Sequence, residues 1–212
     1  MYISRLRLDP QNRQTMRAMA EPKLFHGAIE RGFTGPRQRN LWRVDRLGEA
    51  YYLLVVSPDK PDFSAAAAQF GYPGAEDAWE TKDYMPLLNR VENGSRWHFR
   101  LTANPVRHSA GNAQAGARGK VLAHVTPEQQ QRWLMEKAPA YGFSLAEGAF
   151  LAVNSRWIRF CKPGIASHTV SLQAATFEGT LTVTDAERFR QTLTAGIGRG
   201  KAYGLGLLTI VR

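Results

Sequence analysis

The order of strand-like and helix-like segments repeats once along this 212-residue chain, and the repeat limits the fold more than any other feature. In the first half, strand-like residues 2–8 precede a helical stretch from Pro10 to Arg31, which Pro22 interrupts. Two strands at 41–46 and 51–57, an alanine-rich helix at 63–70 and a strand at 85–91 complete that half. This β-α-β-β-α-β order is typical of a ferredoxin-like domain.

The same order returns after the Asn93-Gly94 turn. Residues 96–103 alternate as a strand, and the capping patterns Thr126-Pro-Glu-Gln and Thr184-Asp-Ala-Glu predict the starts of two helices. Further strands are expected at 150–153, 156–160, 169–183 and 203–211. We therefore predict an α+β protein with two tandem ferredoxin-like domains, residues 1–93 and 94–212.

The composition narrows the class of protein. A hydrophobic content of 43% suffices for buried cores and excludes global disorder. Cys161 is the single cysteine, which excludes an internal disulfide and a thiolate metal cluster. The sequence shows neither an apolar run of the roughly 20 residues that span a bilayer nor a signal-peptide pattern at its start. We expect a soluble, cytoplasmic protein without membrane contact.

Positive charge is concentrated in the second half. The whole chain carries 28 Lys and Arg against 18 Asp and Glu, a formal net charge of +10. Residues 1–95 hold 13 basic and 12 acidic side chains, whereas residues 96–212 hold 15 and 6. Stretches without carboxylates suit a polyanion such as RNA, because each neutralised phosphate releases counterions. The alternative is an ordinary solvated basic surface.

Two segments exceed a plain ferredoxin-like unit. Residues 104–124 form an insertion that is a candidate phosphate-binding arm, or else a mobile surface loop. Residues 196–206 contain five glycines with Arg199 and Lys201, which allows backbone amides to approach a phosphate. This spacing fits neither a Walker A loop nor a dinucleotide fingerprint, and a purely structural turn is the alternative.

Several short motifs occur in the order found in one known family. They are the opening Met-Tyr-Ile-Ser-Arg-Leu, the helix Glu-Pro-Lys-Leu-Phe-His26, Phe99-Arg-Leu-Thr-Ala-Asn-Pro105, Thr126-Pro-Glu, Phe177-Glu-Gly179 and the glycine-rich terminal segment from Gly196 to Leu208. With these motifs the chain resembles the CasE-type CRISPR RNA endonucleases of type I-E systems. The resemblance spans nearly the whole chain.

The resemblance implies a tandem pair of RRM-related domains that cut CRISPR precursor RNA at the 3′ base of each repeat hairpin. It implies no metal and no other cofactor, and it implies that the protein stays on the guide RNA with the other subunits of the Cascade complex. The basic insertion would enter the RNA groove, which assigns RNA contacts to Arg107, Arg118 and Lys120. We add four further candidate RNA-binding residues, which are Arg100, Arg156, Arg199 and Lys201.

RNA supplies its own nucleophile, the 2′-hydroxyl beside the scissile phosphate. The enzyme then needs a proton acceptor, a proton donor for the leaving 5′-oxygen, and cations for the charged intermediate. His26 lies where the family has its catalytic histidine, and helical spacing places Lys23 and Glu30 on the same side. Lys23 stands where the family commonly has tyrosine, so we expect it to hold the phosphate or to shift the protonation of His26.

The resemblance also places basic side chains near the active centre from the region of residues 156–162. Arg159 and Lys162 are the candidates for charge stabilisation there. The other histidines are possible RNA contacts and are not expected to be catalytic; they are His98, His108, His124 and His168.

Three functions remain open at this stage. The first is a metal-independent endoribonuclease that leaves a 2′,3′-cyclic phosphate and a 5′-hydroxyl. The second is a slow or non-catalytic subunit that binds the hairpin and anchors guide RNA. The third, a metabolic enzyme on the same scaffold, lacks support from any metal-ligand spacing, P-loop or nucleophile elbow.

Overall fold

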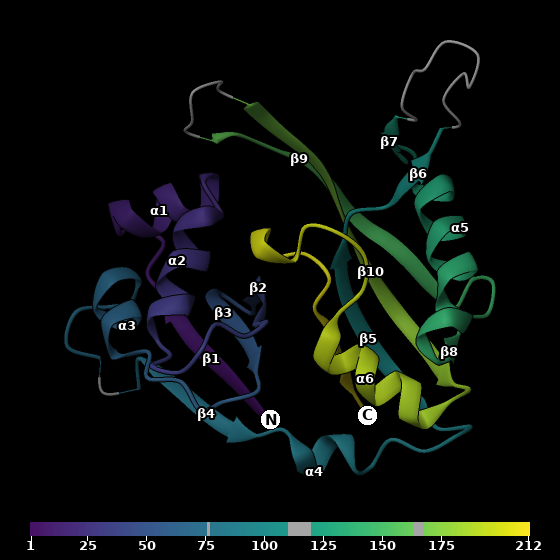
Figure 1. The fold of residues 1–212 in the computed structure, drawn as a ribbon, viewed down its shortest axis with the longest axis horizontal. Helices are drawn as coiled ribbons and strands as arrows, with labels where there is room; N and C mark the ends of the chain where they lie inside the picture. The colour runs from purple at the N-terminus through teal and green to yellow at the C-terminus, as the bar shows by residue number, and fades with distance from the viewer. Residues whose placement is uncertain (76, 110–119, 163–167) are drawn as a thin grey trace.

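Two antiparallel sheets lie side by side in the computed structural model, which describes residues 1–75, 77–109, 120–162 and 168–212 (Figure 1). The first sheet belongs to the N-terminal half and the second to the C-terminal half, and the helix α4 (Met85–Leu88) lies between the two along the chain. Within the described ranges, no helix is long and apolar enough to cross a membrane.

The first sheet has the strand order β2-β3-β1-β4. Its strands are β1 (Tyr2–Leu8), β2 (Leu41–Leu47), β3 (Ala50–Ser57) and β4 (Trp79–Asp83), and its helices are α1 (Arg13–Ala20), α2 (Lys23–Arg31) and α3 (Ser64–Phe70). The first and third strands of the β-α-β-β-α-β unit are central, as in a ferredoxin-like domain. The predicted interruption at Pro22 is confirmed, because α1 ends before it and α2 begins after it.

The strand predicted at residues 85–91 is wrong. Pro86 lies in the first turn of α4, and the carboxylate of Asp83 accepts a hydrogen bond from the Met85 amide, so this segment starts a short helix. The fourth strand is instead β4, which pairs with β1 and places Thr81 beside Ser4. Their hydroxyl oxygens are 2.7 Å apart.

The second sheet repeats the arrangement around two long strands, β9 and β10. Its strands are β5 (Arg96–Ala103), β8 (Phe143–Ser144), β9 (Phe150–Lys162), β10 (His168–Val183) and β11 (Leu208–Val211), with the helices α5 (Pro127–Lys137) and α6 (Ala186–Ala195) and the short turns η2 (Ala138–Tyr141) and η3 (Lys201–Tyr203). The order is β11-β5-β10, with β9 and β8 both paired to β10. This second ferredoxin-like order confirms the predicted fold class, while the division at residue 93 stays a prediction.

Three predicted boundaries in this half need correction. The strands expected at 150–153 and 156–160 form one strand, β9, which accommodates a register shift opposite Thr176 and Phe177. The last strand begins at Leu208 and not at Tyr203, because the left-handed glycines Gly204 and Gly206 precede it. The second capping residue is Asp185, whose side chain accepts from the Arg188 amide.

The inserted segment 104–124 starts and ends as a two-stranded ribbon. Strands β6 (Val106–His108) and β7 (Val121–Ala123) pair antiparallel, so at least the base of the insertion is an ordered arm and not a structureless loop. Residues 110–119 between these strands lie outside the described residues.

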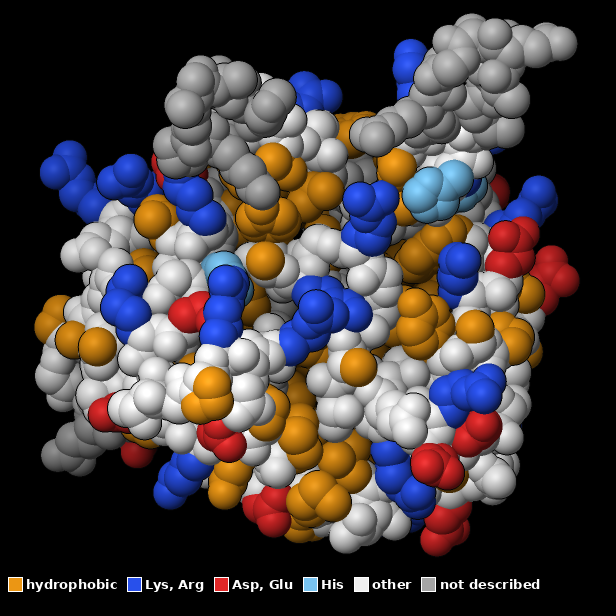
Figure 2. Space-filling view, viewed as in Figure 1, with side chains coloured by type: hydrophobic (Ala, Val, Ile, Leu, Met, Phe, Trp, Pro, Cys, Tyr) orange, Lys and Arg blue, Asp and Glu red, His pale blue; other side chains and the backbone are white. Residues whose placement is uncertain are grey.

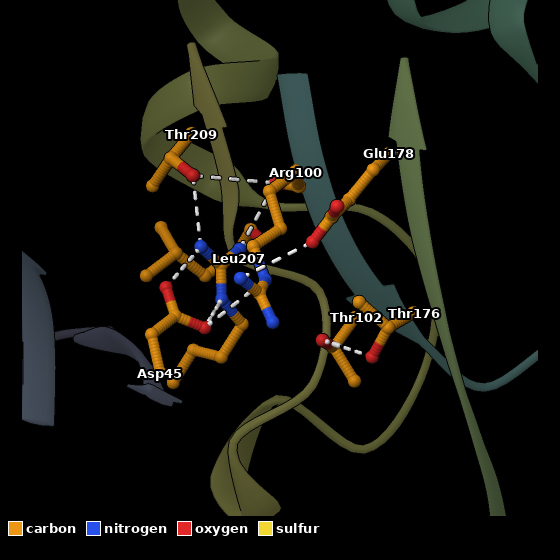
Figure 3. A network of polar contacts seen from close by, with 8 residues as sticks. Asp45, Arg100, Thr102, Thr176, Glu178, Leu207 and Thr209 are labelled. Carbon is orange, nitrogen blue, oxygen red and sulfur yellow. Dashed lines mark hydrogen bonds and ion pairs between the residues drawn. The ribbon is translucent and has the colours of Figure 1, made fainter. Parts of the chain in front are cut away.

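A buried arginine, Arg43, joins the two sheets through the polar network shown in Figure 3. Arg43 on β2 is 2% exposed and donates to both carboxylate oxygens of Asp45, at 2.7 and 2.6 Å. The same guanidinium donates across to the second domain, to the carbonyl oxygens of Arg100 and Leu207 and to the hydroxyl of Thr209. These bonds fix the relative position of the domains, and with it the cleft described next.

Candidate active-site cleft

The helix α2 carries His26 at the boundary between the first domain and solvent. Phe25, Ala28 and Ile29 are buried beneath the helix, whereas the His26 side chain is 23% exposed. The predicted orientation of His26 towards solvent or substrate agrees with this arrangement.

The imidazole of His26 lies between an acidic and a basic side chain. Arg37 donates from Nη2 to His26 Nε2 at 3.3 Å, and the other ring nitrogen, Nδ1, is 4.0 Å from Glu30 Oε1. Glu30 is itself held by Arg37 at 3.2 Å and by the amide of Asn40 at 3.3 Å. Glu30 therefore helps to fix both His26 and the cation that contacts it.

These contacts indicate the protonation state of His26. A guanidinium can only donate, so Nε2 is the unprotonated nitrogen in this arrangement and the ring proton belongs on Nδ1, facing Glu30. Burial lowers the pKa of His26; the charge of Glu30 opposes this effect and that of Arg37 adds to it. A neutral imidazole with a lone pair on Nε2 is suited to accept a proton.

A cleft of about 580 Å³ opens beside His26. One wall comes from the first domain, with Glu30 and residues 37–40, and the opposite wall is residues 198–203 of the glycine-rich segment. Its cationic lining consists of Arg37, Arg39, Arg199 and Lys201, against the single carboxylate of Glu30. In Figure 2, blue side chains gather on both sides of the middle of this face. The cleft thus suits an anionic ligand.

Backbone geometry fixes the glycine-rich wall. Gly204 has a φ of +78° and packs so closely that a Cβ atom there would lie 2.8 Å from the ring of Trp42 on β2. Gly206 has a φ of +90°, and its amide donates to the Thr102 carbonyl at 2.7 Å. These close approaches hold η3 against α2 and β2, so Lys201 faces the cleft from a fixed turn. Burial, and secondarily the charge of Arg39, lowers the pKa of Lys201.

Of the three predicted catalytic residues whose side chains the structure describes, His26 lines the cleft and Lys23 and Arg159 do not. The ammonium of Lys23 pairs with Glu21 at 3.1 Å, although helical spacing places Lys23 on the side of His26. The guanidinium of Arg159 lies over the Trp157 ring at 5.4 Å and lines another hollow. The side chain of Lys162 lies outside the described residues. The roles of these three residues stay predictions.

The predicted RNA-binding residues fall into three places. Arg199 and Lys201 line the cleft itself. Arg107 and Lys120 are exposed at the inserted arm, while Arg118 lies outside the described residues. The remaining two lie between the domains.

Arg156 and Arg100 both line the hollow between the sheets. Arg156 is exposed on β9. Arg100 is half-buried and paired with Glu178 at 3.1 Å and Asp45 at 3.4 Å, so part of its charge is already neutralised within the protein. Within the described ranges, no three His, Cys, Asp or Glu side chains gather as potential metal ligands.

Sequence reasoning missed Arg37 and Arg39. They lie in the segment between α2 and β2, which the repeat pattern leaves unassigned, and only their spacing in Pro36-Arg-Gln-Arg39 could have marked them. The structure adds them because this segment turns back over His26 to form one wall of the cleft.

Fold and cleft together define a class of protein: two tandem ferredoxin-like domains that present a histidine and a cationic glycine-rich loop to one anion-binding cleft. The chain belongs to the CRISPR associated protein family, whose sequence model matches residues 1–212.

Similarity to individual proteins extends over the full length. The CRISPR-associated endoribonuclease Cse3 of Thermus thermophilus is 34% identical over 223 residues, which cover 99% of each chain. A structure of CRISPR endoribonuclease Cse3 bound to a 19-nucleotide RNA superposes with a TM-score of 0.80 at 30% identity and covers 100% of both chains. A Thermus thermophilus Cse3 bound to RNA that represents a pre-cleavage complex gives 0.78 at 29% identity, covering 100% of this chain and 98% of the other.

Proposed function

We propose that this protein, a CRISPR RNA-processing endoribonuclease, cuts the precursor transcript at the 3′ base of the repeat hairpin without a metal ion. One observation carries the proposal: His26 of the first domain and the cationic glycine-rich loop of the second face each other across a single cleft. This cleft offers a proton acceptor and positive charge at the same place, as RNA transesterification requires.

In the reaction, the 2′-hydroxyl oxygen attacks the adjacent phosphorus and its proton passes to His26 Nε2. The bond between phosphorus and the 5′-oxygen breaks, that oxygen takes up a proton from water, and the proton on His26 returns to solvent. The products are a 2′,3′-cyclic phosphate and a 5′-hydroxyl. Arg37 occupies Nε2 in the free protein, so it has to move to the phosphate before His26 can act as a base.

The cations of the cleft have a separate task. Arg199 and Lys201 approach from the second domain and stabilise the negative charge that grows on the phosphate oxygens. Lys201 is half-buried, and charge stabilisation is stronger where water is partly excluded. We keep Lys162 and Arg159 as further candidates for this role, and Lys23 as a residue that reaches the phosphate only if its pair with Glu21 opens.

Retention of the guide RNA follows from the rest of the basic surface. We propose that Arg107, Arg118 and Lys120 of the inserted arm contact hairpin phosphates. The protein would then stay on the mature guide RNA together with Cascade subunits in the cytoplasm. A Cse3 with 30% identity to this chain binds a 19-nucleotide RNA, which supports this assignment.

The test uses the cognate repeat RNA in the presence of a chelator. We expect the wild-type protein to cut this RNA and to leave a 2′,3′-cyclic end. His26→Ala should lower the single-turnover rate by a factor of about 100 or more, since general base catalysis contributes roughly 10²–10⁴-fold. A 2′-deoxy nucleotide at the cut site should abolish cutting, while both changes leave RNA binding intact.

Tyr72→Phe, a conservative change at an exposed residue away from the cleft lining, is the matched control for protein handling and should cut at a rate within a few-fold of the wild type. Cutting that requires a divalent metal ion, or an unchanged rate for His26→Ala, would contradict the mechanism. Tight hairpin binding without any cutting would identify the protein as a guide-RNA anchor.

A further inference from the structure

A second hollow lies between the two domains, next to the His26 cleft. It measures about 220 Å³, below the roughly 300–1,000 Å³ of sites for drug-sized ligands. The first domain contributes aromatic and apolar side chains to its lining, among them Phe25 and Tyr51. The sheet of the second domain contributes polar ones, among them Asn154 and Thr176. Its size and mixed lining fit a small flat group with polar edges, such as one nucleobase.

This hollow connects the cleft to the outer edge of the second sheet. Tyr203 lines both the His26 cleft and the interdomain hollow. Met19, Arg156 and Ile158 line both the interdomain hollow and a third one of about 470 Å³ along β9. The three hollows therefore follow one another as a groove from His26, past Tyr203, to β9.

Charge along the groove favours a polyanion. The hollow along β9 is lined by Arg156 and Arg159 and by no carboxylate among the described residues. In the interdomain hollow, Asp45 is the one described carboxylate, and Arg43 binds both of its oxygens. Exposed arginines with neutralised carboxylates suit the phosphates of a nucleic acid strand.

An exposed tryptophan stands at the outer end of this groove. Trp157 is 44% exposed, although Trp42, Trp97 and Trp133 are buried in the cores at 2%, 2% and 6%. Arg159 lies over its ring at 5.4 Å. Exposed aromatic rings beside arginine are the stacking platforms on which single-stranded nucleic acids bind their bases. A packing role for Trp157 would have left its ring buried.

We propose that this groove binds the unpaired RNA that continues on the 3′ side of the cut, with one base in the interdomain hollow and a following base stacked on Trp157. The inference rests on the proposed function, which puts the base of the hairpin stem at the His26 cleft. The strand beyond the cut is then unpaired and leaves the cleft along the groove that shares Tyr203 with it and that carries aromatic rings and arginines along its length.

The experiment compares two hairpin RNAs that carry a 2′-deoxy nucleotide at the cut site and stay intact. One ends just after the cut site, and the other continues for about six unpaired nucleotides. The readout is the dissociation constant of the short RNA divided by that of the tailed RNA. Because both constants are measured with the same protein sample, an inactive fraction of the protein affects both equally. We expect the tail to tighten wild-type binding about tenfold, since stacking of one base is worth roughly 5- to 150-fold.

Trp157→Ala should lower this ratio several-fold, to the part contributed by the base in the interdomain hollow, and Trp157→Phe should keep most of the wild-type ratio. The matched control is Tyr72→Ala, because Tyr72 is also exposed beneath an arginine, Arg7 at 4.9 Å, but lies outside the groove. The control should keep the full ratio. An abasic nucleotide at the tail position that stacks on Trp157 should lower the wild-type ratio and have no further effect on Trp157→Ala.

Two results would overturn the inference: a tail that adds nothing to wild-type binding, or a Trp157→Ala protein with the wild-type ratio. If Trp157→Ala keeps the wild-type ratio but no longer binds a protein partner of the wild type, Trp157 belongs to a protein-docking surface instead. These outcomes are separate from the proposed function, which is tested by wild-type cutting of unmodified RNA and not by the effect of the tail on binding.

Discussion

At the scale of single residues, the state of the His26 imidazole depends on two neighbours of opposite charge. Burial has the largest effect and lowers the pKa of His26, while the charge of Glu30 raises this pKa and the charge of Arg37 lowers it. The contact between Arg37 and Nε2 also blocks the nitrogen that accepts the proton in the reaction we propose. Binding of a phosphate that attracts Arg37 would release this nitrogen, which links activation of the base to the presence of substrate.

The first residue-scale prediction concerns Glu30→Gln. Removal of the carboxylate removes the charge that raises the pKa of His26, so this pKa falls further. A base loses activity when it is protonated, so the acid limb of the single-turnover rate profile should move to lower pH. Rates measured across the pH range, together with the imidazole proton resonances, check this expectation.

Arg37→Ala is the control for which we expect a pH shift of the opposite sign. It removes a cation that lowers the pKa of His26, so the acid limb should move to higher pH. Equal profiles for both variants and the wild type would show that a different group limits the rate.

The sequence revealed part of this site. The family motif and the helical spacing identify His26 and place Glu30 beside it, because both lie on one regular helix. The motif does not reveal that Lys23 pairs with Glu21. A flexible lysine can pair with any of several nearby carboxylates, and the sequence does not show which pair forms. Arg37 and Arg39 depend on the path of an irregular segment, which has no periodicity to read.

At the scale of elements, the glycine-rich segment and the inserted arm are the additions to a plain ferredoxin-like unit, and we assign RNA contacts of the second domain to them. Both interrupt the regular order without disturbing the sheets. The first is held by close backbone contacts, and the second extends from the sheet as a paired ribbon. Their roles are therefore open to separate tests.

For the glycine-rich segment, we compare Gly204→Ala with Gly48→Ala. Both glycines have left-handed φ values, +78° and +60°, but a Cβ at Gly204 meets Trp42 whereas one at Gly48 meets nothing within 4 Å. Gly48→Ala should cost about 1 kcal/mol of unfolding free energy from backbone strain alone. Gly204→Ala should cost roughly 1–3 kcal/mol more, because it overpacks the interface. Urea unfolding of both proteins measures the difference; equal losses would mean that the loop shifts without resistance.

For the inserted arm, the prediction is a change in salt dependence. Replacement of Arg107, Arg118 and Lys120 by alanine should weaken binding of the hairpin and reduce the slope of log K against log salt by about 0.7–0.9 for each phosphate contact that is lost. The control replaces Arg5, Arg17 and Arg188, which pair with carboxylates elsewhere. If the arm variant keeps the wild-type slope, the arm makes no phosphate contacts.

Regular elements are the part of the fold that the sequence predicts well. Alternation in β5 and the cap of α5 identify both elements to within a residue or so. The prediction of a fourth strand at residues 85–91 is wrong because Leu87, Leu88 and Val91 form a short apolar run, which is equally compatible with a strand and with a buried turn. Pairing of β4 with β1 decides the matter, and that pairing is a long-range contact.

At the scale of the whole molecule, one hydrophobic cluster and the hydrogen bonds of the buried Arg43 join the two domains. Leu41 and Val56 of the first domain pack in the same hydrophobic cluster as Phe99 and Leu101 of the second. Arg43 and Asp45 lie in the middle of this contact, each with a side chain that is 3% exposed. The domains should therefore unfold together.

This expectation leads to a prediction for Arg43→Met. The change leaves the Asp45 carboxylate with Arg100 alone, at 3.4 Å, and removes the bonds to Leu207 and Thr209. A buried pair that loses one partner costs roughly 3–5 kcal/mol of unfolding free energy, whereas replacement of both partners costs less. The double variant Arg43→Met/Asp45→Leu should therefore have a higher free energy of unfolding in urea than the single variant Arg43→Met. A double variant at least as unstable as the single one would contradict the account.

The joined domains also decide what a fragment of this chain can do. His26 comes from one half of the polypeptide and Lys201 from the other, and each occupies its place because Arg43 ties the halves. A gene split after the codon for Gly94 would thus encode two polypeptides that are inert when made separately. Chemistry would return only when both associate, which makes the split pair a reporter of their reassembly.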